Sequence, residues 1–401
     1  MRHLLTRVLA AALALAAALA QSQSAPQTQL SHTTESLRGA SVVSRNIAWA
    51  SGTHGTYLRT TDAGRNWIPD QVPGAESLDF RAVVAFSADE AFLMSAGPGD
   101  QSRIYHTADA GQHWSLQFTN TNPKGFFDSM VFWDPTHGIV LGDPIPDETG
   151  KLKFELLITG DGQTWTHIPP SQLPPALDGE GAFAASNTCL AILKSPVDSE
   201  APWKSGASAP RQPDEEEASA PDPNIWFATG GRAARVFHSP DRGRTWQVFD
   251  TPIVHGPDSA GIFSIAFRDP THGVIAGGDY KHPDRDGPNL AFTSDAGKTW
   301  TLSQIFPQSY YSAVAYDRKD NGPSSNHHRD QNPKNKDADE NPVNSRLFIV
   351  GPKFIYDFRP PQNPTRISPR KKSGVQFNAV SPYPTGGALV VGPKGSIASI
   401  P

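Results

Sequence analysis

Short apolar stretches recur along the chain, and polar or glycine-containing turns separate each one from the next. Ahead of Trp114, for example, the stretches AVVAF (82–86), AFLMSAG (91–97) and IYHTAD (104–109) follow one another, and WSLQF begins at Trp114 itself. Stretches of this length and polarity are typical of β-strands. After residue 30 we find no long amphipathic helical pattern. The hydrophobic pattern therefore predicts an all-β fold.

One short motif with a central Asp, a Gly and a final Trp recurs five times. It reads TTDAGRNW from Thr60, TADAGQHW from Thr107, TGDGQTW from Thr159, SPDRGRTW from Ser239 and TSDAGKTW from Thr293. The five aspartates are 47, 52, 80 and 54 residues apart, and the long interval contains a stretch rich in Pro, Ala, Ser and Glu. A unit of about 50 residues is the size of a four-stranded propeller blade.

Further units support the same architecture. FWDPTHGIVLGD (132–143) and FRDPTHGVIAGGD (267–279) repeat one strand, turn and strand pattern. Residues 311–359 give a sixth unit, and residues 377–400 give a seventh that lacks its fourth strand. We expect residues 27–34 to supply that strand, because closing the ring removes open sheet edges. The sequence thus predicts a seven-bladed β-propeller of four-stranded antiparallel blades, with an N-terminal strand completing the last blade.

The first residues have the pattern of an export signal. MRHLLTR is basic, VLAAALALAAALA is apolar, and a small-x-small cleavage site ends at Ala20. Residues 1–20 are therefore interpreted as a signal peptide, with an uncleaved anchor as the alternative, and we expect a secreted or periplasmic protein with no transmembrane span after cleavage. Residues 21–401 are expected to form one domain. Two polar segments, 195–224 and 317–345, are predicted to be disordered inserts between the first and second strands of blades four and six.

Composition and charge narrow the classes of function that this chain can have. A formal net charge of −5 over 401 residues argues against nucleic-acid binding, which requires a basic surplus. The single cysteine, Cys189, excludes an internal disulfide and lies in the apolar run TCLAIL, so we expect it in the core. His327 and His328 in the second insert could bind a metal only weakly. We therefore predict neither a metal nor a cofactor.

The five motifs are interpreted as architecture. Their Asp can accept backbone N–H bonds, their Gly permits a positive φ, and their Trp can cover the turn between adjacent sheets. One aspartate per blade cannot converge on one substrate, so none of them is predicted to be catalytic; His137 and His272 in the DPTHG turns are likewise predicted to be turn residues. The structural set is Asp62, Gly64, Trp67, Asp109, Gly111, Trp114, Asp161, Gly162, Trp165, Asp241, Gly243, Trp246, Asp295, Gly297 and Trp300.

These motifs resemble the Asp-box, or bacterial neuraminidase, repeat. With the export signal, the repeat length and the DPTHG turns, the chain is most similar to the photosystem II stability and assembly factor group, which has exported bacterial relatives. The resemblance implies a seven-bladed propeller that acts as a non-enzymatic assembly partner. Sialidases share the box but need an arginine triad and a Tyr nucleophile announced by F/Y-R-I-P, whose nearest string here is FRPP (358–361). Xyloglucanase-like glycosidases share it too, in chains about twice this length.

A candidate site follows from the topology. In a four-stranded meander, the connections between blades and the turns between the second and third strands lie on the face opposite the motifs. Aligning the starts of the innermost strands places a mixed set of residues around the axial mouth of that face, with Asp143 and Asp279 on neighbouring loops. The set is Arg38, Arg81, Asp128, Glu180, Tyr310 and Tyr311. Convergence of charges and rings is what a binding site requires.

Three interpretations of this set stay open. The residues could be solvated or paired across neighbouring blades. Arg38 and Arg81 could hold an acidic peptide or a carboxylate, because a guanidinium offers a planar fork of donors. Asp128 and Glu180 could be the acid and base of a glycoside hydrolase. We predict a monomeric, non-catalytic binding or assembly scaffold for a protein or peptide partner, with a carbohydrate-active hydrolase as the alternative.

Overall fold

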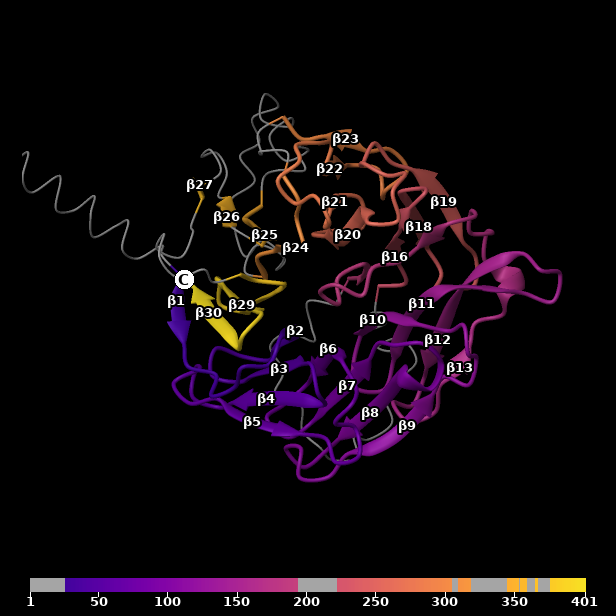
Figure 1. The fold of residues 1–401 in the computed structure, drawn as a ribbon. Helices are drawn as coiled ribbons and strands as arrows, with labels where there is room; N and C mark the ends of the chain where they lie inside the picture. The colour runs from indigo at the N-terminus through magenta and orange to yellow at the C-terminus, as the bar shows by residue number, and fades with distance from the viewer. Residues whose placement is uncertain are drawn as a thin grey trace, which may run out of the picture.

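The computed structural model describes residues 26–193, 222–304, 309–318, 345–352, 354–358, 365–366 and 376–401. Its strands form seven antiparallel sheets that surround one axis, as Figure 1 shows. Beyond strands, the described residues contain two short 3₁₀ turns, η1 (Gly99–Gln101) and η2 (Pro170–Gln172). The predicted fold class, an all-β seven-bladed propeller of four-stranded blades, is confirmed.

The first three blades are meanders whose first strand lies innermost. Blade 1 consists of β2 (Leu37–Val42), β3 (Ala48–Gly52), β4 (Thr56–Thr60) and β5 (Ile68–Gln71). Blade 2 consists of β6 (Phe80–Ala85), β7 (Ala91–Ser95), β8 (Arg103–Thr107) and β9 (Ser115–Thr119). Blade 3 consists of β10 (Phe127–Phe132), β11 (Gly138–Pro146), β12 (Leu152–Thr159) and β13 (Thr166–His167).

The later blades follow the same order, with one addition. Blade 4 consists of β15 (Leu190–Ile192), β16 (Ile225–Ala228), β18 (Arg235–Ser239) and β19 (Gln247–Asp250). Blade 5 consists of β20 (Ala260–Phe267), β21 (Gly273–Asp279), β22 (Leu290–Thr293) and β23 (Thr301–Leu302), and its sheet is extended by β17 (Gly230–Gly231) and β14 (Glu180–Gly181). Blade 6 consists of β24 (Ala313–Tyr316), β25 (Leu347–Gly351), β26 (Phe354–Phe358) and β27 (Thr365–Arg366).

The seventh blade joins the two ends of the chain. It consists of β28 (Ala379–Pro382), β29 (Ala388–Gly392) and β30 (Ser396–Ile400), with β1 (Gln27–Gln29) as its fourth strand. β1 pairs antiparallel with β30, with Thr28 opposite Ala398. The predicted closure of the ring by an N-terminal strand is therefore present.

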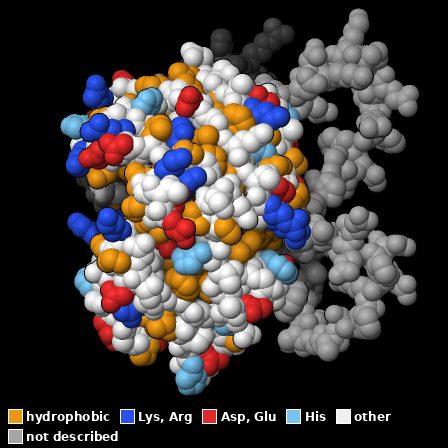
Figure 2. Space-filling view, turned by 90° about the vertical axis from the view of Figure 1, so that its right-hand side faces the viewer, with side chains coloured by type: hydrophobic (Ala, Val, Ile, Leu, Met, Phe, Trp, Pro, Cys, Tyr) orange, Lys and Arg blue, Asp and Glu red, His pale blue; other side chains and the backbone are white. Residues whose placement is uncertain are grey.

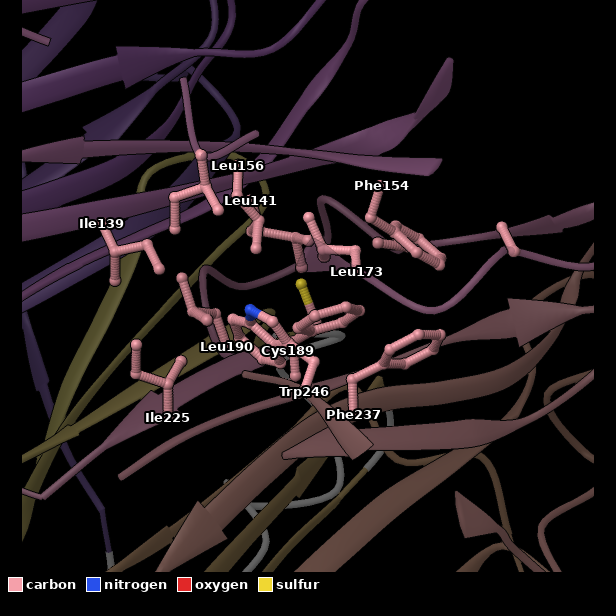
Figure 3. Close-up of a cluster of buried hydrophobic side chains, with 14 of the residues drawn as sticks. Ile139, Leu141, Phe154, Leu156, Leu173, Cys189, Leu190, Ile225, Phe237 and Trp246 are labelled. Carbon is pink, nitrogen blue, oxygen red and sulfur yellow. The ribbon is translucent and has the colours of Figure 1, made fainter. Parts of the chain in front are cut away.

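The hydrophobic core is divided into layers between successive blades. In the layer between blades 3 and 4, shown in Figure 3, Leu141 and Phe154 meet Phe237 and Leu190, and the thiol of Cys189 points among them. Burial raises the pKa of that thiol. Cys189 is thus a small apolar core residue, and the layered packing explains why the strands are apolar on both faces.

Serine side chains link the innermost strands of neighbouring blades. Ser41 Oγ accepts the N–H of Ala85 at 2.9 Å, and Ser264 Oγ accepts the N–H of Val314 at 2.9 Å. These bonds satisfy backbone donors that no strand partner reaches, which is necessary near a ring axis where strands converge.

The five motif turns share one hydrogen-bond pattern. In the second, Thr107 Oγ1 donates to Asp109 Oδ1 at 3.0 Å and accepts the N–H of Gly111, while Asp109 also accepts the N–H of His113. The bonds from His113 lower the pKa of Asp109 to about 2. The glycines of the turns all have positive φ, and they are Gly64, Gly111, Gly162, Gly243 and Gly297. Each aspartate is thus engaged within its own turn.

Several predicted segments lie outside the described residues. They are the signal peptide (1–20), the inner parts of the two inserts (194–221 and 319–344) and the residues His327 and His328. The two gaps fall between β15 and β16 and between β24 and β25. Among the residues that the structure describes, no helix is long and apolar enough to cross a membrane.

Candidate binding site at the axial mouth

Charge is unevenly organised over the molecule. On the rim that Figure 2 displays, basic and acidic side chains are interspersed among apolar ones, without a field of one sign. At the axial mouth, in contrast, several charged groups from different blades lie close together. The site is therefore built from the innermost strands.

A β-bulge repeats near the start of the innermost strand. The register shifts between Leu37 and Gly39 in β2, and corresponding shifts occur in β6, β10 and β20. A bulge leaves one residue unpaired and re-aims its side chain. The unpaired residues are Arg38, Arg81, Asp128 and Phe263. Four blades therefore present one side chain each at equivalent positions, and three of these are residues that the sequence selected.

Arg38 and Arg81, from neighbouring blades, lie close to one carboxylate. Arg81 Nε is 2.9 Å from Asp79 Oδ2. Arg38 Nε is buried and has no hydrogen-bond acceptor among the described residues. Burial lowers the pKa of the Arg38 guanidinium, and the charge of Arg81 lowers it further. Asp79 and Tyr310 act in the opposite direction and raise this pKa. Two guanidinium groups lie near the Asp79 carboxylate, and burial disfavours the ionised form of Asp128, the other carboxyl that the charge of Arg81 reaches. This balance of charges favours an added anion.

A segment that precedes blade 4, Leu177–Thr188, lies across this mouth; we call it the axial segment. It is part of the trace that reaches the middle of the ring in Figure 1. It contacts blades 2, 3 and 6 at once. Its bonds run from Ala182 N to Asp143 Oδ1 (2.9 Å), from Arg81 Nη1 to Ala184 O (3.0 Å), from Met130 N to Asn187 Oδ1 (2.7 Å) and from Ser186 Oγ to Ser312 O (2.9 Å). The axial segment is thus a fixed wall of the site.

Two carboxyl groups, one buried and one partly buried, lie beside the axial segment. Asp128 is 1% exposed, and burial, followed by the nearby Asp143, raises its pKa well above the usual value. Burial also raises the pKa of Asp143 to about 6. The sequence placed Asp143 and Asp279 on loops, whereas Asp143 lies within β11 and Asp279 is the last residue of β21. The surroundings of Asp128 therefore favour its neutral form over its ionised form.

The structure buries Glu180, near the start of the axial segment, in an ion pair with Arg235. Its carboxylate accepts two bonds from Arg235, with Nε to Oε1 at 2.9 Å and Nη2 to Oε2 at 2.5 Å, and one from Thr229 Oγ1 at 2.6 Å. The side chain is fully buried. The alignment of strand starts placed it differently because blade 4 begins only at Leu190, after the axial segment. A fourth bond, from the Leu177 N–H to Oε2 at 2.8 Å, occupies the remaining lone pair, so the carboxylate has none free to act as a base.

The two tyrosines have different environments. Tyr310 is 7% exposed, and its ring meets that of Phe263 edge-on at 5.0 Å. Tyr311 is fully buried between blades 5 and 6, 5.6 Å from the ring of Phe354. Tyr310 thus packs at the mouth, whereas Tyr311 packs in the core layer with Leu290 and Ile349. Tyr311 is a core residue rather than a ligand-facing one.

Sequence reasoning missed an aromatic cluster beside the arginines. Phe183 of the axial segment stacks on Phe263 at 4.1 Å with an interplanar angle of 7°, and Tyr280 meets both rings edge-on. The one trace of this cluster in the sequence is Gly230, because the Phe183 ring needs a residue without a side chain there: a Cβ would lie 2.1 Å from the ring. A pattern search cannot connect that glycine with a ring so far away in the chain.

Fold and site together define a closed seven-bladed β-propeller with a cationic and aromatic axial mouth. No protein-family model matches the chain, so the resemblance of the five motifs to the Asp-box repeat stays a prediction.

Two photosystem II proteins are similar in sequence. The assembly protein Ycf48 of Synechococcus sp. (strain JA-2-3B'a(2-13)) is 22% identical over 279 residues, which cover 57% of this chain and 78% of that protein. The chloroplastic stability/assembly factor HCF136 of Arabidopsis thaliana is 35% identical over 66 residues, which are 16% of this chain and 15% of that protein. These similarities support the predicted likeness to the assembly factor group.

Solved structures share the fold. A structure of YCF48 bound to a D1 peptide matches with a TM-score of 0.58 and 15% identity, covering 94% of both chains. The GH74 xyloglucanase of Xanthomonas campestris matches with a TM-score of 0.55 and 14% identity, covering 93% of this chain and 53% of that one. At these identities the likeness establishes the architecture alone.

Proposed function

We propose that this chain is an exported, monomeric and non-catalytic scaffold that binds a protein partner at its axial mouth. Arg38 and Arg81 take a carboxylate of the partner. The observation that carries the proposal is the excess of positive charge around Asp79, together with the buried Arg38 Nε that lacks an acceptor among the described residues. A carboxylate would satisfy that donor, because a guanidinium binds carboxylates through two parallel N–H bonds.

The similar proteins support a binding role. Both sequence relatives are assembly factors, and YCF48, which has a similar fold, has been solved with a peptide bound. A secreted or periplasmic location agrees with the signal pattern of residues 1–20. The partner of this chain is identified only by its chemistry, as a polypeptide that carries an accessible carboxylate.

The alternative, a glycoside hydrolase, draws support from the fold of the xyloglucanase. The local chemistry does not favour it, because Glu180 is bound by Arg235 and Asp128 is buried. Turnover on a panel of polysaccharides, with Asp128→Asn and Glu180→Gln variants as controls, tests this alternative. Turnover by the parent that both variants abolish would establish a hydrolase.

Peptide binding tests the scaffold proposal directly. Short fluorescent peptides with several acidic residues and a free C-terminus are titrated against the full chain and an Arg38→Gln, Arg81→Gln double variant. We expect the double variant to bind at least ~10-fold more weakly, since a charge-assisted hydrogen bond contributes roughly 1.5–3 kcal/mol. Arg244→Gln, an exposed arginine in a motif turn, is the matched control and should bind like the parent. Equal affinities of the parent and the double variant would refute the proposed site.

A further inference from the structure

We propose that the aromatic cluster beside the arginines selects the end of a polypeptide, in which an aromatic side chain immediately precedes or carries the free α-carboxylate. This inference rests on the proposed function and specifies the partner class. The cluster consists of Phe183, Phe263, Tyr280 and Tyr310, which come from the axial segment and from blades 5 and 6.

The cluster has a buried layer and an exposed layer. Phe263 is 2% exposed and forms the base, where it stacks on Phe183 and meets Tyr310 edge-on. Phe183 is half-buried, and Tyr280, which follows β21, is 48% exposed. The two outer rings meet at 6.5 Å and 81°. A further aromatic ring can extend this edge-to-face arrangement, which contributes beyond simple burial of area.

The aromatic surface is continuous with the cationic one. Tyr310 lies between them, since its ring contacts Phe263 and its hydroxyl interacts with the charge of Arg38. Arg38 in turn lies close to Asp79 and Arg81. An apolar surface therefore directly borders an anion site. The ligand that matches both is one that carries an aromatic group next to a carboxylate.

Backbone packing holds the rings in place. Gly230 and Gly261 leave bare backbone under Phe183, where an added Cβ would approach the ring to 2.1 and 3.0 Å. Gly278 has a φ of 136°, and a Cβ there would lie 2.9 Å from Tyr310 Cα. These close approaches fix the rings before any ligand arrives. A preformed surface binds with a smaller loss of side-chain freedom.

Charge complementarity decides the occupant. Two guanidinium groups lie near Asp79, and burial disfavours the ionised form of Asp128, the other carboxyl that the charge of Arg81 reaches, so the site favours an added negative charge over a neutral sugar. The α-carboxylate of a chain end lies only a few bonds from the side chain of its own residue. A C-terminal aromatic residue therefore presents both groups at close range.

Four peptides with one common neutral sequence test the inference by fluorescence anisotropy with the full chain. Two end in Phe and two in Ala, and one of each pair has a free carboxylate and the other an amide. With the parent, we expect the Phe carboxylate to bind at least ~10-fold more tightly than the other three.

In Tyr280→Ala the preference for Phe over Ala should fall to about twofold or less, while Tyr280→Phe should retain it. Circular dichroism establishes that each variant is folded, and Phe183→Leu provides a second, milder change.

The outcomes separate this inference from the proposed function. If acidic peptides bind through Arg38 and Arg81 but Phe and Ala ends bind equally, the aromatic specificity is refuted and the scaffold proposal stands. If the arginine variant leaves all binding unchanged, the proposed function fails instead. Binding of xyloglucan oligosaccharides that Tyr280→Ala abolishes, without binding of the Phe peptide, would also overturn the inference in favour of a sugar.

Discussion

Asp143 shows how one residue links the axial segment to solvent pH. Its Oδ1 accepts the N–H of Ala182, and burial raises the pKa of its carboxyl from 3.8 to about 6. The folded state therefore binds this proton more tightly than the unfolded state does. The contribution of this proton to the free energy of unfolding is fully present below about pH 4 and is lost as the pH rises through about 6. A difference of about two pKa units corresponds to up to about 3 kcal/mol.

Asp143→Asn should remove the pH dependence that Asp143 gives to the free energy of unfolding. The amide keeps an oxygen that accepts the N–H of Ala182, but it never ionises. We expect the variant to be more stable than the parent at about pH 7.5, by up to about 3 kcal/mol, and its free energy of unfolding to change less between about pH 4.5 and 7.5. Urea unfolding at both pH values measures this. Glu148→Gln, an exposed residue on the same hairpin, is the control. Parallel pH profiles for parent and Asp143→Asn would disprove the assignment.

At the scale of elements, β1 acts as the outer strand of a blade despite its short length. Gln29 Nε2 donates to Ala63 O, and Gln29 Oε1 accepts the Trp67 indole N–H at 2.9 Å. Gln117, on the outer strand β9, makes the same pair of bonds to the next motif turn, to Gly162 O and from Trp165. The two glutamines thus connect the outer strand of one blade to the motif turn of the next.

Gln29→Ala should lower the free energy of unfolding by about 1–3 kcal/mol, because it leaves the buried Trp67 N–H without an acceptor. Gln117→Ala should have a similar effect through Trp165. Thr28→Ala, on an exposed position of β1, should change stability by less than about 0.5 kcal/mol. Chemical denaturation followed by Trp fluorescence compares the three. A loss no larger for Gln29→Ala than for Thr28→Ala would contradict the proposed link.

At the scale of the whole molecule, closure of the ring couples the seven blades to one another. Every blade packs against two neighbours, and β1 is the strand that covers the edge of β30. Without it, β30 would present unpaired backbone groups, which promote association between chains.

Deleting residues 27–29 from the full chain should therefore lower the melting temperature by several degrees and cause concentration-dependent association. Circular dichroism should still show the β-sheet signal of the remaining blades. Differential scanning calorimetry and light scattering measure the two effects, with Gln27→Ala as the matched control on the same strand. A monomeric deletion variant that melts like the parent would show that closure contributes little.

The architecture was predictable because its causes are local. Strand periodicity, turn residues such as those around Asp109 and the spacing of the motifs all depend on a few neighbouring residues. They were sufficient for the blade count, for the closing strand near Gln27 and for the order of strands. The positions of Arg38 and Arg81 followed from the same repeat, since equivalent positions in a repeat occupy equivalent places.

The contents of the axial mouth depended on packing between distant segments. The extra residues before Leu190 shifted Glu180 out of the repeat, and only the folded chain brings it to Arg235. Tyr311 packs in the core between blades 5 and 6, which only the assembled blades reveal. Phe183 reaches Phe263 across a long separation in sequence. Local patterns fix the blades, whereas the occupants of the axis follow from which distant side chains fill the space that the closed ring leaves.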